Sequence, residues 1–129
     1  MNGIEQEVHD HVIYVRFIGH VTAQHMISWL SEVAGHLSGT DSAVLVVESA
    51  EAHEIEAGAR RYMVTWMKAN RSLLRSGCRA VIRIVRDRQQ RAKLSRPQIA
   101  KAFPVPLELV DSREAAWECA RRWLSGQCT

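Results

Sequence analysis

Residues 43–66 read AVLVVESAEAHEIEAGARRYMVTW, and this stretch decides the fold that we expect. It begins with five consecutive apolar residues, 43–47, a pattern typical of a central strand covered on both faces. Glutamates and a histidine follow as far as Glu56, and we predict an acidic loop there. From Gly58 onward apolar residues recur at helical spacing through Trp66. In a sheet with helices packed on it, ligands and partners bind where such a strand ends, so we expect any site here.

The residues before this stretch predict a hairpin followed by a helix. Apolar side chains alternate along 12–18, and a tight turn at 9–11 separates this strand from an earlier one. Gly19 is expected to end the second strand. Thr22 is a suitable N-cap for a helix in which apolar residues recur three and four positions apart as far as Leu37.

The residues after this stretch continue the alternation of strands and helices. We expect the helix from Gly58 to end at Gly77, a strand over 79–86, and one or two short basic helices broken near Pro97. A short strand over 107–110 and a helix capped by Ser112 complete the chain. The order ββαβαβαβα predicts an α/β domain with a mixed sheet of about five strands and about four helices mainly on one face.

Length and composition place the chain among globular proteins. Its 129 residues fit a single domain over 1–126 with a tail over 127–129, and 47% of them are hydrophobic. No apolar run reaches the roughly 20 residues of a membrane span, and the polar first ten residues do not form a secretory signal. Three widely spaced cysteines are typical of a reducing compartment, so we expect a cytoplasmic protein.

Charge is distributed unevenly along the sequence. Residues 1–59 hold nine acidic residues and one arginine, a net charge of −8, whereas residues 71–101 hold ten basic residues and one aspartate, a net charge of +9. The simplest interpretation is that the two halves neutralise each other within one domain. The alternative is an anionic partner.

Five segments resemble the STAS-domain family, which includes the anti-sigma-factor antagonists (SpoIIAA-like proteins) and the cytoplasmic modules of sulfate transporters. They are VIYVRFIGHVTAQHM (12–26), AVLVVES (43–49), HEIEAGARRYM (53–63), CRAVIRIV (78–85) and VPLELVDSREAAWECARRWL (105–124). The chain is also similar to divergent bacterial proteins grouped as STAS or SEC14-like. The resemblance covers nearly the whole chain, rests on topology and pattern, and implies a SpoIIAA-like fold and a regulatory role through protein contact.

One position departs from the family pattern. In the antagonists a serine or threonine at the start of the helix after the central strand is phosphorylated to switch partner binding. The matching position here is Ala57, which cannot be phosphorylated, and Glu56 matches the family's aspartate only in charge. A fixed carboxylate supplies part of a phosphate's charge without its switching. The resemblance therefore implies the fold and the contact surface more strongly than the phosphoswitch.

The sequence contains no motif typical of a metal site, a cofactor site or a catalytic site. The six histidines do not fall at zinc-ligand spacing, so we expect no metal, and no cofactor is implied. There is no G-x-S-x-G elbow, and Cys78 and Cys119 fall at structural positions, so we expect no enzymatic activity. Trp66 and Trp123 are predicted to fill the core, with Trp29 and Trp117 partly exposed.

We therefore predict a non-catalytic regulatory or scaffold module that binds a protein, or a second copy of itself, through the acidic loop and the helix start after the central strand. The candidate partner-binding residues are Glu51, His53, Glu54, Glu56, Ala57, Gly58, Arg60 and Arg61. The alternative is a binder of an anionic ligand, a lipid headgroup or nucleic acid through the basic 79–101 segment. Its candidate residues are Arg86, Arg88, Arg91, Lys93 and Arg96.

Overall fold

The computed structural model describes residues 2–40, 42–97 and 103–126. Strands and helices alternate along the chain much as the sequence predicts. In chain order they are β1 (Gly3–His9), β2 (Val12–Val21), α1 (Ala23–Ser38), β3 (Ala43–Ile55), α2 (Ala57–Ala69), α3 (Arg71–Gly77), β4 (Cys78–Ile84), α4 (Arg88–Leu94), β5 (Leu107–Val110) and α6 (Arg113–Leu124). The predicted tail and part of the segment around Pro97 lie outside the described residues.

The strands form one mixed sheet in the order β1-β2-β3-β4-β5. β1 pairs antiparallel with β2 through a turn in which Asp10 has a φ of 55°, and β2, β3, β4 and β5 are mutually parallel. Asp10 suits this turn because a short polar side chain tolerates the left-handed conformation. The carboxyl ends of β2, β3, β4 and β5 therefore lie at one edge of the sheet.

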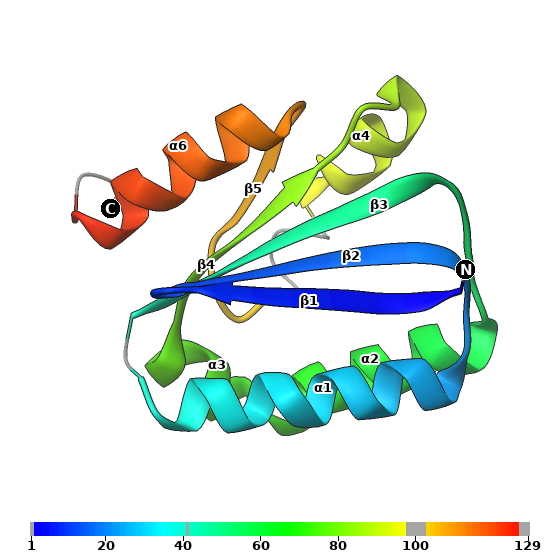
Figure 1. The fold of residues 1–129 in the computed structure, drawn as a ribbon, viewed down its shortest axis with the longest axis horizontal. Helices are drawn as coiled ribbons and strands as arrows, with labels where there is room; N and C mark the ends of the chain where they lie inside the picture. The colour runs from blue at the N-terminus through cyan, green and yellow to red at the C-terminus, as the bar shows by residue number, and fades with distance from the viewer. Residues whose placement is uncertain (1, 41, 98–102, 127–129) are drawn as a thin grey trace.

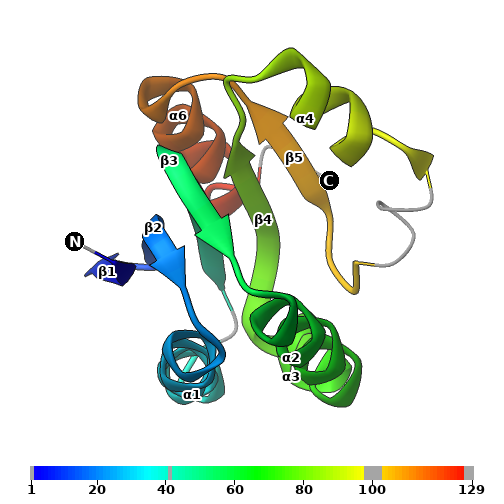
Figure 2. The same ribbon diagram turned by 90° about the vertical axis from the view of Figure 1, so that its right-hand side faces the viewer.

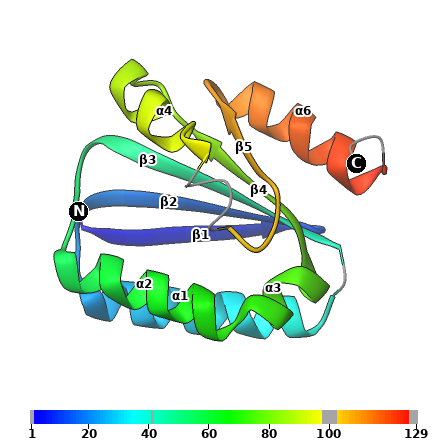
Figure 3. The same cartoon turned by 180° about the vertical axis from the view of Figure 1, so that it is seen from behind.

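Helices cover both faces of the sheet unequally, as Figures 1 and 2 show. α1, α2 and α3 form a layer on one face, and α6 packs on the other over β3 and β4. Viewed from behind, α2 and α3 run side by side with α1 under the whole length of the sheet (Figure 3). The predicted mixed sheet with helices mainly on one face is confirmed.

Each face of the sheet has its own apolar core, because successive residues of a strand point to opposite faces. Val15 and Phe17 of β2 pack toward α1, whereas Val44 and Val46 of β3 pack toward α6. Trp29 of α1 is buried, contrary to the sequence prediction, and meets Phe17 edge to face at 5.6 Å between ring centroids. Its indole N–H donates to the side chain of Gln6 at 2.9 Å, so the ring is buried without leaving its polar atom unpaired.

Two strands are longer than predicted. β2 continues past Gly19, whose φ of 59° fits a bulge at which the β2–β3 register shifts. β3 continues to Ile55, so the acidic loop predicted over 48–56 is wrong: the backbone there is extended and pairs again with β2. After the register shift, Gly19, His20 and Val21 pair with His53, Glu54 and Ile55, so polar residues continue within the strand.

The helical layer also differs from the sequence prediction at one point. The single helix expected over 58–77 is two helices that meet at Asn70, whose side-chain amide and backbone N–H both donate to the carbonyl of Trp66. Asn70 is thereby a C-cap for α2 and the residue before α3. No helix in the described part of the chain is long and apolar enough to cross a membrane.

Candidate functional site

The start of α2 lies beside the start of α1 because both helices follow the carboxyl ends of neighbouring parallel strands, β2 and β3 (Figure 1). A Cβ atom built on Gly58 would lie 3.8 Å from the Cβ of Ala23, which shows how closely the two first turns approach. Thr22 caps α1 by accepting a hydrogen bond from the backbone N–H of His25 at 3.2 Å. In return, the His25 ring accepts from the Thr22 N–H at 3.1 Å, which completes a capping box.

Glu56 ties these two helix starts together. One carboxylate oxygen accepts a hydrogen bond from the backbone N–H of Ala23 at 3.3 Å, and the other lies 2.9 Å from Nε2 of His20. The hydrogen bond from His20, and then that from Ala23, hold the pKa of Glu56 below its ordinary value. A carboxylate at a helix N-terminus also interacts favourably with the helix dipole. Glu56 thus has a structural role among the residues predicted to bind a partner.

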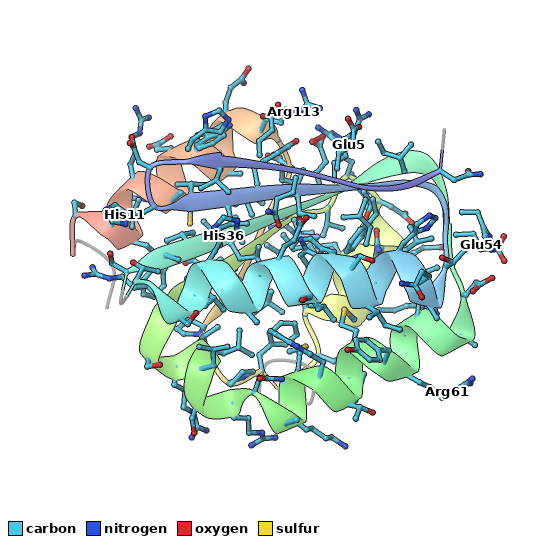
Figure 4. All side chains as sticks on the ribbon, turned by 60° about the horizontal axis from the view of Figure 1, so that its bottom comes forward. Glu5, His11, His36, Glu54, Arg61 and Arg113 are labelled. Carbon is cyan, nitrogen blue, oxygen red and sulfur yellow. The ribbon has the colours of Figure 1, made fainter. Side chains whose placement is uncertain are left out.

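The remaining predicted partner-binding residues divide into two groups. Glu54, Ala57, Arg60 and Arg61 are exposed, and Gly58 is partly exposed between α1 and α2. We call these five residues the helix-start surface. The side chains of Glu51 and His53 lie outside the described part of the structure. Glu54 and Arg61 project from the same end of the molecule in Figure 4.

Glu48 lies apart from this surface, on the face of the sheet covered by α6. It is 3% exposed and accepts hydrogen bonds from the Tyr14 hydroxyl, from Nε of Arg113 at 2.8 Å and from Arg86 at 3.4 Å. The Arg113 guanidinium lies 5.9 Å from the centroid of the Tyr14 ring, which itself stacks on Trp117 at 6.0 Å. β2, β3, the segment that follows β4 and the start of α6 each contribute a side chain. Glu48 is therefore a buried ionic centre rather than part of an acidic contact surface.

The charges of this cluster shift two pKa values in opposite directions. Burial alone would raise the pKa of Glu48, but hydrogen bonds from Arg113 and Tyr14 outweigh it and lower that pKa. Burial, and next the bond to Glu48, raise the pKa of Tyr14 to about 12. Glu48 stays ionised and Tyr14 stays protonated at neutral pH. Because neither group changes its protonation state near pH 7, this pair is suited to stabilising the fold and not to transferring protons.

Part of this cluster could have been found from the sequence. Glu48 directly follows the apolar run of the central strand, and Arg113 directly follows the cap Ser112 after the last strand. Carboxyl ends of parallel strands meet at one edge, so these two positions converge. Tyr14 gave no signal, because a tyrosine within an alternating strand is equally consistent with plain core packing.

The five candidate residues of the basic segment are all exposed, and two of them also form hydrogen bonds within the protein. Arg86 bonds Glu48, and Arg91 donates to the carbonyl of Leu109 at 3.4 Å. Arg88, Lys93 and Arg96 are exposed on or just after α4. Within the described part of the chain, no group of three or more His, Cys, Asp or Glu side chains is placed to hold a metal ion. Burial raises the pKa of the Cys78 thiol to about 11, which disfavours the reactive thiolate.

Comparisons with known proteins identify the fold. No protein-family model and no curated protein matches the sequence. Among solved structures, an uncharacterised protein of the DUF3478 family with a SpoIIAA-like fold, from Shewanella loihica PV-4, matches with a TM-score of 0.71 and 13% identity, covering 96% of this chain and 95% of that one. An anti-sigma factor antagonist from Mycobacterium paratuberculosis matches with a TM-score of 0.49 and 20% identity, covering 92% of this chain and 95% of that one. The chain is a mixed α/β domain with the SpoIIAA-like fold, as the STAS resemblance implies.

Proposed function

We propose that this chain is a non-catalytic regulatory module that binds a partner protein through the helix-start surface. The observation that carries the proposal is the composition of this surface. Glu54, Arg60 and Arg61 are exposed and of both signs, and Ala57 and Gly58 leave the first turn of α2 without bulky side chains. A partner can therefore approach the helix backbone closely while charge selects its orientation.

Exposed apolar side chains near this surface support protein contact. Val64, on α2, is 48% exposed, and Ile27, on α1, is 37% exposed. Ile27 lies one turn after Ala23, the residue that faces Gly58 across the two helices, so it lies on the side of α1 toward α2. Apolar side chains beside a charged rim are a usual composition for a protein interface.

The proposed interaction works without a phosphorylated residue at the start of α2. Ala57 is the first residue of that helix and has no hydroxyl. Glu56, the residue before it, is already bonded to His20 and Ala23. Regulation at this position would then depend on the availability of the partner rather than on modification of this chain.

Charge reversal on the helix-start surface tests the proposal. Affinity capture from a lysate of the source organism would compare the wild type with Glu54→Lys and Arg61→Glu, using Arg88→Glu on α4 as a control with the same charge change as Arg61→Glu. We expect specific partners to be retained by the wild type and the control and lost from the two surface variants. Equal recovery of every partner by all four proteins would refute the proposal. Arg88→Glu also tests the alternative, because loss of nucleic acid or anionic vesicles from that variant alone would favour the basic segment.

A further inference from the structure

The strand β1 forms an open edge of the sheet. Among the described strands it lies at one end of the order, and it pairs with β2 over all seven of its residues without a register shift. Figure 2 shows β1 at the margin of the sheet, with no other labelled strand on its outer side. Every second residue of such a strand directs its backbone N–H and C=O away from the neighbouring strand. These groups of β1 can therefore pair with a further strand.

The opposite edge of the sheet is protected in ways that β1 is not. β5 has only four residues, and the carbonyl of Leu109 accepts a hydrogen bond at 3.4 Å from Arg91 of the adjacent α4. Short length, a covering segment, proline and bulges are common means of protecting an edge from other strands. β1 contains no proline, and its unbroken register with β2 leaves no bulge. Its protection is the charge of Glu5 and Glu7, which selects among partners.

One face of β1 is apolar. Directly opposed residues of paired strands point to the same face, so the register with β2 assigns each side chain to a face. Ile4 lies opposite Phe17 and Val8 lies opposite Ile13, and both of these β2 residues belong to the core beneath α1. Val8 is 44% exposed, so an added strand would cover apolar surface on this face.

The other face of β1 is acidic. Glu5 and Glu7 are exposed there, with Glu5 opposite Arg16 and Glu7 opposite Tyr14 of β2. Because α6 packs over β3 and β4, a hollow of about 350 Å³ remains on this side, and its lining includes both glutamates and Trp117. Long basic side chains of an added strand would have room on this face. Glu5 would then have a cation on each side.

We infer that β1 is the docking edge for an extended segment of a partner protein in which basic and apolar residues alternate. The basic side chains lie opposite Glu5 and Glu7, and the apolar ones lie opposite Ile4 and Val8. In this mode of recognition the backbone hydrogen bonds provide affinity and the alternate side chains provide specificity. Pairs of opposite charge and pairs of apolar residues are both favourable directly across a sheet. The contact is separate from the helix-start surface and does not depend on it.

A second copy of this chain fits the same edge poorly. Antiparallel pairing of two β1 strands about an axis through Gln6 places Glu5 of one copy opposite Glu7 of the other. An axis through either glutamate places that residue opposite itself. Like charges directly opposite each other destabilise a pair of strands. The two glutamates therefore disfavour a second copy and favour a basic segment.

Two peptides of equal composition test the inference on the wild type alone. In Lys-Val-Lys-Thr-Lys-Val-Lys, with blocked ends, the residue order is the same in both directions, so lysines fall opposite both glutamates in parallel and antiparallel pairing. In Lys-Lys-Val-Thr-Val-Lys-Lys no register places lysines opposite both. We expect the alternating peptide to bind saturably with a Kd below about 1 mM, and the control to bind about tenfold more weakly or less, because cross-strand charge pairs are lost.

Amide hydrogen exchange and charge reversal locate the bound peptide. Alternate amides of β1 should gain protection from exchange, whereas those of β5 should not change. The double variant Glu5→Lys, Glu7→Lys should lose the alternating lysine peptide and bind Glu-Val-Glu-Thr-Glu-Val-Glu instead. Glu54→Lys with Glu118→Lys, two exposed positions with the same total charge change, should bind the peptides as the wild type does.

Four results would overturn the inference. They are an absence of saturable binding, equal affinity of the wild type for the two lysine peptides, unchanged binding of the alternating lysine peptide by Glu5→Lys, Glu7→Lys, and protection centred on elements other than β1. Protection of β1 that rises with protein concentration without peptide would show that a second copy occupies the edge, and would also overturn it. Because the control variant alters Glu54 of the helix-start surface, its unchanged peptide binding would separate this contact from the one that partner capture tests.

Discussion

The carboxylate of Glu56 bonds the backbone N–H of Ala23, so the residue before α2 caps the start of α1. Its second oxygen bonds His20 near the end of β2, which joins one strand and two helix starts in a single contact. These two contacts of Glu56 therefore form a frame that holds the backbone of the helix-start surface in place. The two glutamates therefore differ: Glu56 bonds the start of α1, whereas its exposed neighbour Glu54 belongs to the surface that we propose binds a partner.

Removal of the Glu56 carboxylate should loosen this frame. We expect Glu56→Ala to lower the melting temperature by a few degrees, because the first turn of α1 loses a hydrogen-bond acceptor and His20 loses its partner. Glu54→Ala is the matched control, since Glu54 is exposed and its carboxylate lies 3.9 Å from Nδ1 of His20, a long ion-pair distance. It should melt close to the wild type. Equal melting temperatures for the two variants in thermal denaturation followed by circular dichroism would contradict the capping role.

Loss of Glu48 should be far more damaging than loss of an exposed glutamate. Glu48→Ala leaves the Tyr14 hydroxyl and two guanidinium groups without their shared acceptor, and we expect a loss of roughly 2–4 kcal/mol in the free energy of unfolding. Glu114→Ala, an exposed change in the first turn of α6, should cost less than about 1 kcal/mol. Urea denaturation measures both. A cost for Glu48→Ala no larger than that for Glu114→Ala would show that the cluster contributes little.

Tyr14 should ionise unusually late in an alkaline titration. Its pKa of about 12 in the folded protein lies above the ordinary value of 10.0, so the unfolded chain releases this proton first. The raised pKa, caused by burial and next by the bond to Glu48, therefore contributes stability that is fully present below about pH 10 and is lost as the pH rises toward 12. Ultraviolet absorbance of the phenolate should show a transition near pH 12 that is missing in Tyr14→Phe. Complete ionisation of every tyrosine near pH 10 would contradict the assignment.

The sequence predicts the fold well because the apolar residues whose spacing indicates strands and helices are the same residues that pack in the core. The run 43–47 is a strand covered on both faces, and Thr22 and Ser112 cap the helices that they were predicted to begin. Errors occur where tertiary contacts override local preference. Gly19 was expected to stop a strand, but its positive φ instead fits a bulge that lets β2 and β3 continue.

The candidate site was less predictable, because charge in the sequence does not show which charges meet. Glu48 and Glu56 belong to one acidic run, yet the first is buried under α6 and the second caps α1. Arg83 and Arg86 belong to one basic run, yet the first lines an apolar cavity and the second pairs with Glu48. Arg83 lies within β4, whereas Arg86 lies two residues beyond the end of that strand. Residue type alone therefore does not predict which of two charged residues close in the sequence is buried or paired.

Two glycines in the helical layer should respond to alanine in opposite directions. Gly77, at the end of α3, lies against α1: a Cβ there would be 2.6 Å from the carbonyl oxygen of Leu37 and 3.1 Å from its Cβ. Both of these atoms belong to a packed helix, so α3 or α1 must shift, and we expect Gly77→Ala to cost roughly 1–3 kcal/mol. It should also disturb the start of β4, which follows directly at Cys78.

Gly35, near the end of α1, is the matched control for this change. A Cβ at this position would meet no atom within 4 Å, and the residue lies inside the helix. Alanine has a higher helix propensity than glycine, so Gly35→Ala should stabilise the protein by about 0.5–1 kcal/mol. Chemical denaturation of both variants measures the two effects on one scale. Two changes of the same sign would mean that helix propensity alone governs both positions, and the close contact between α1 and α3 would then have no measurable effect on stability.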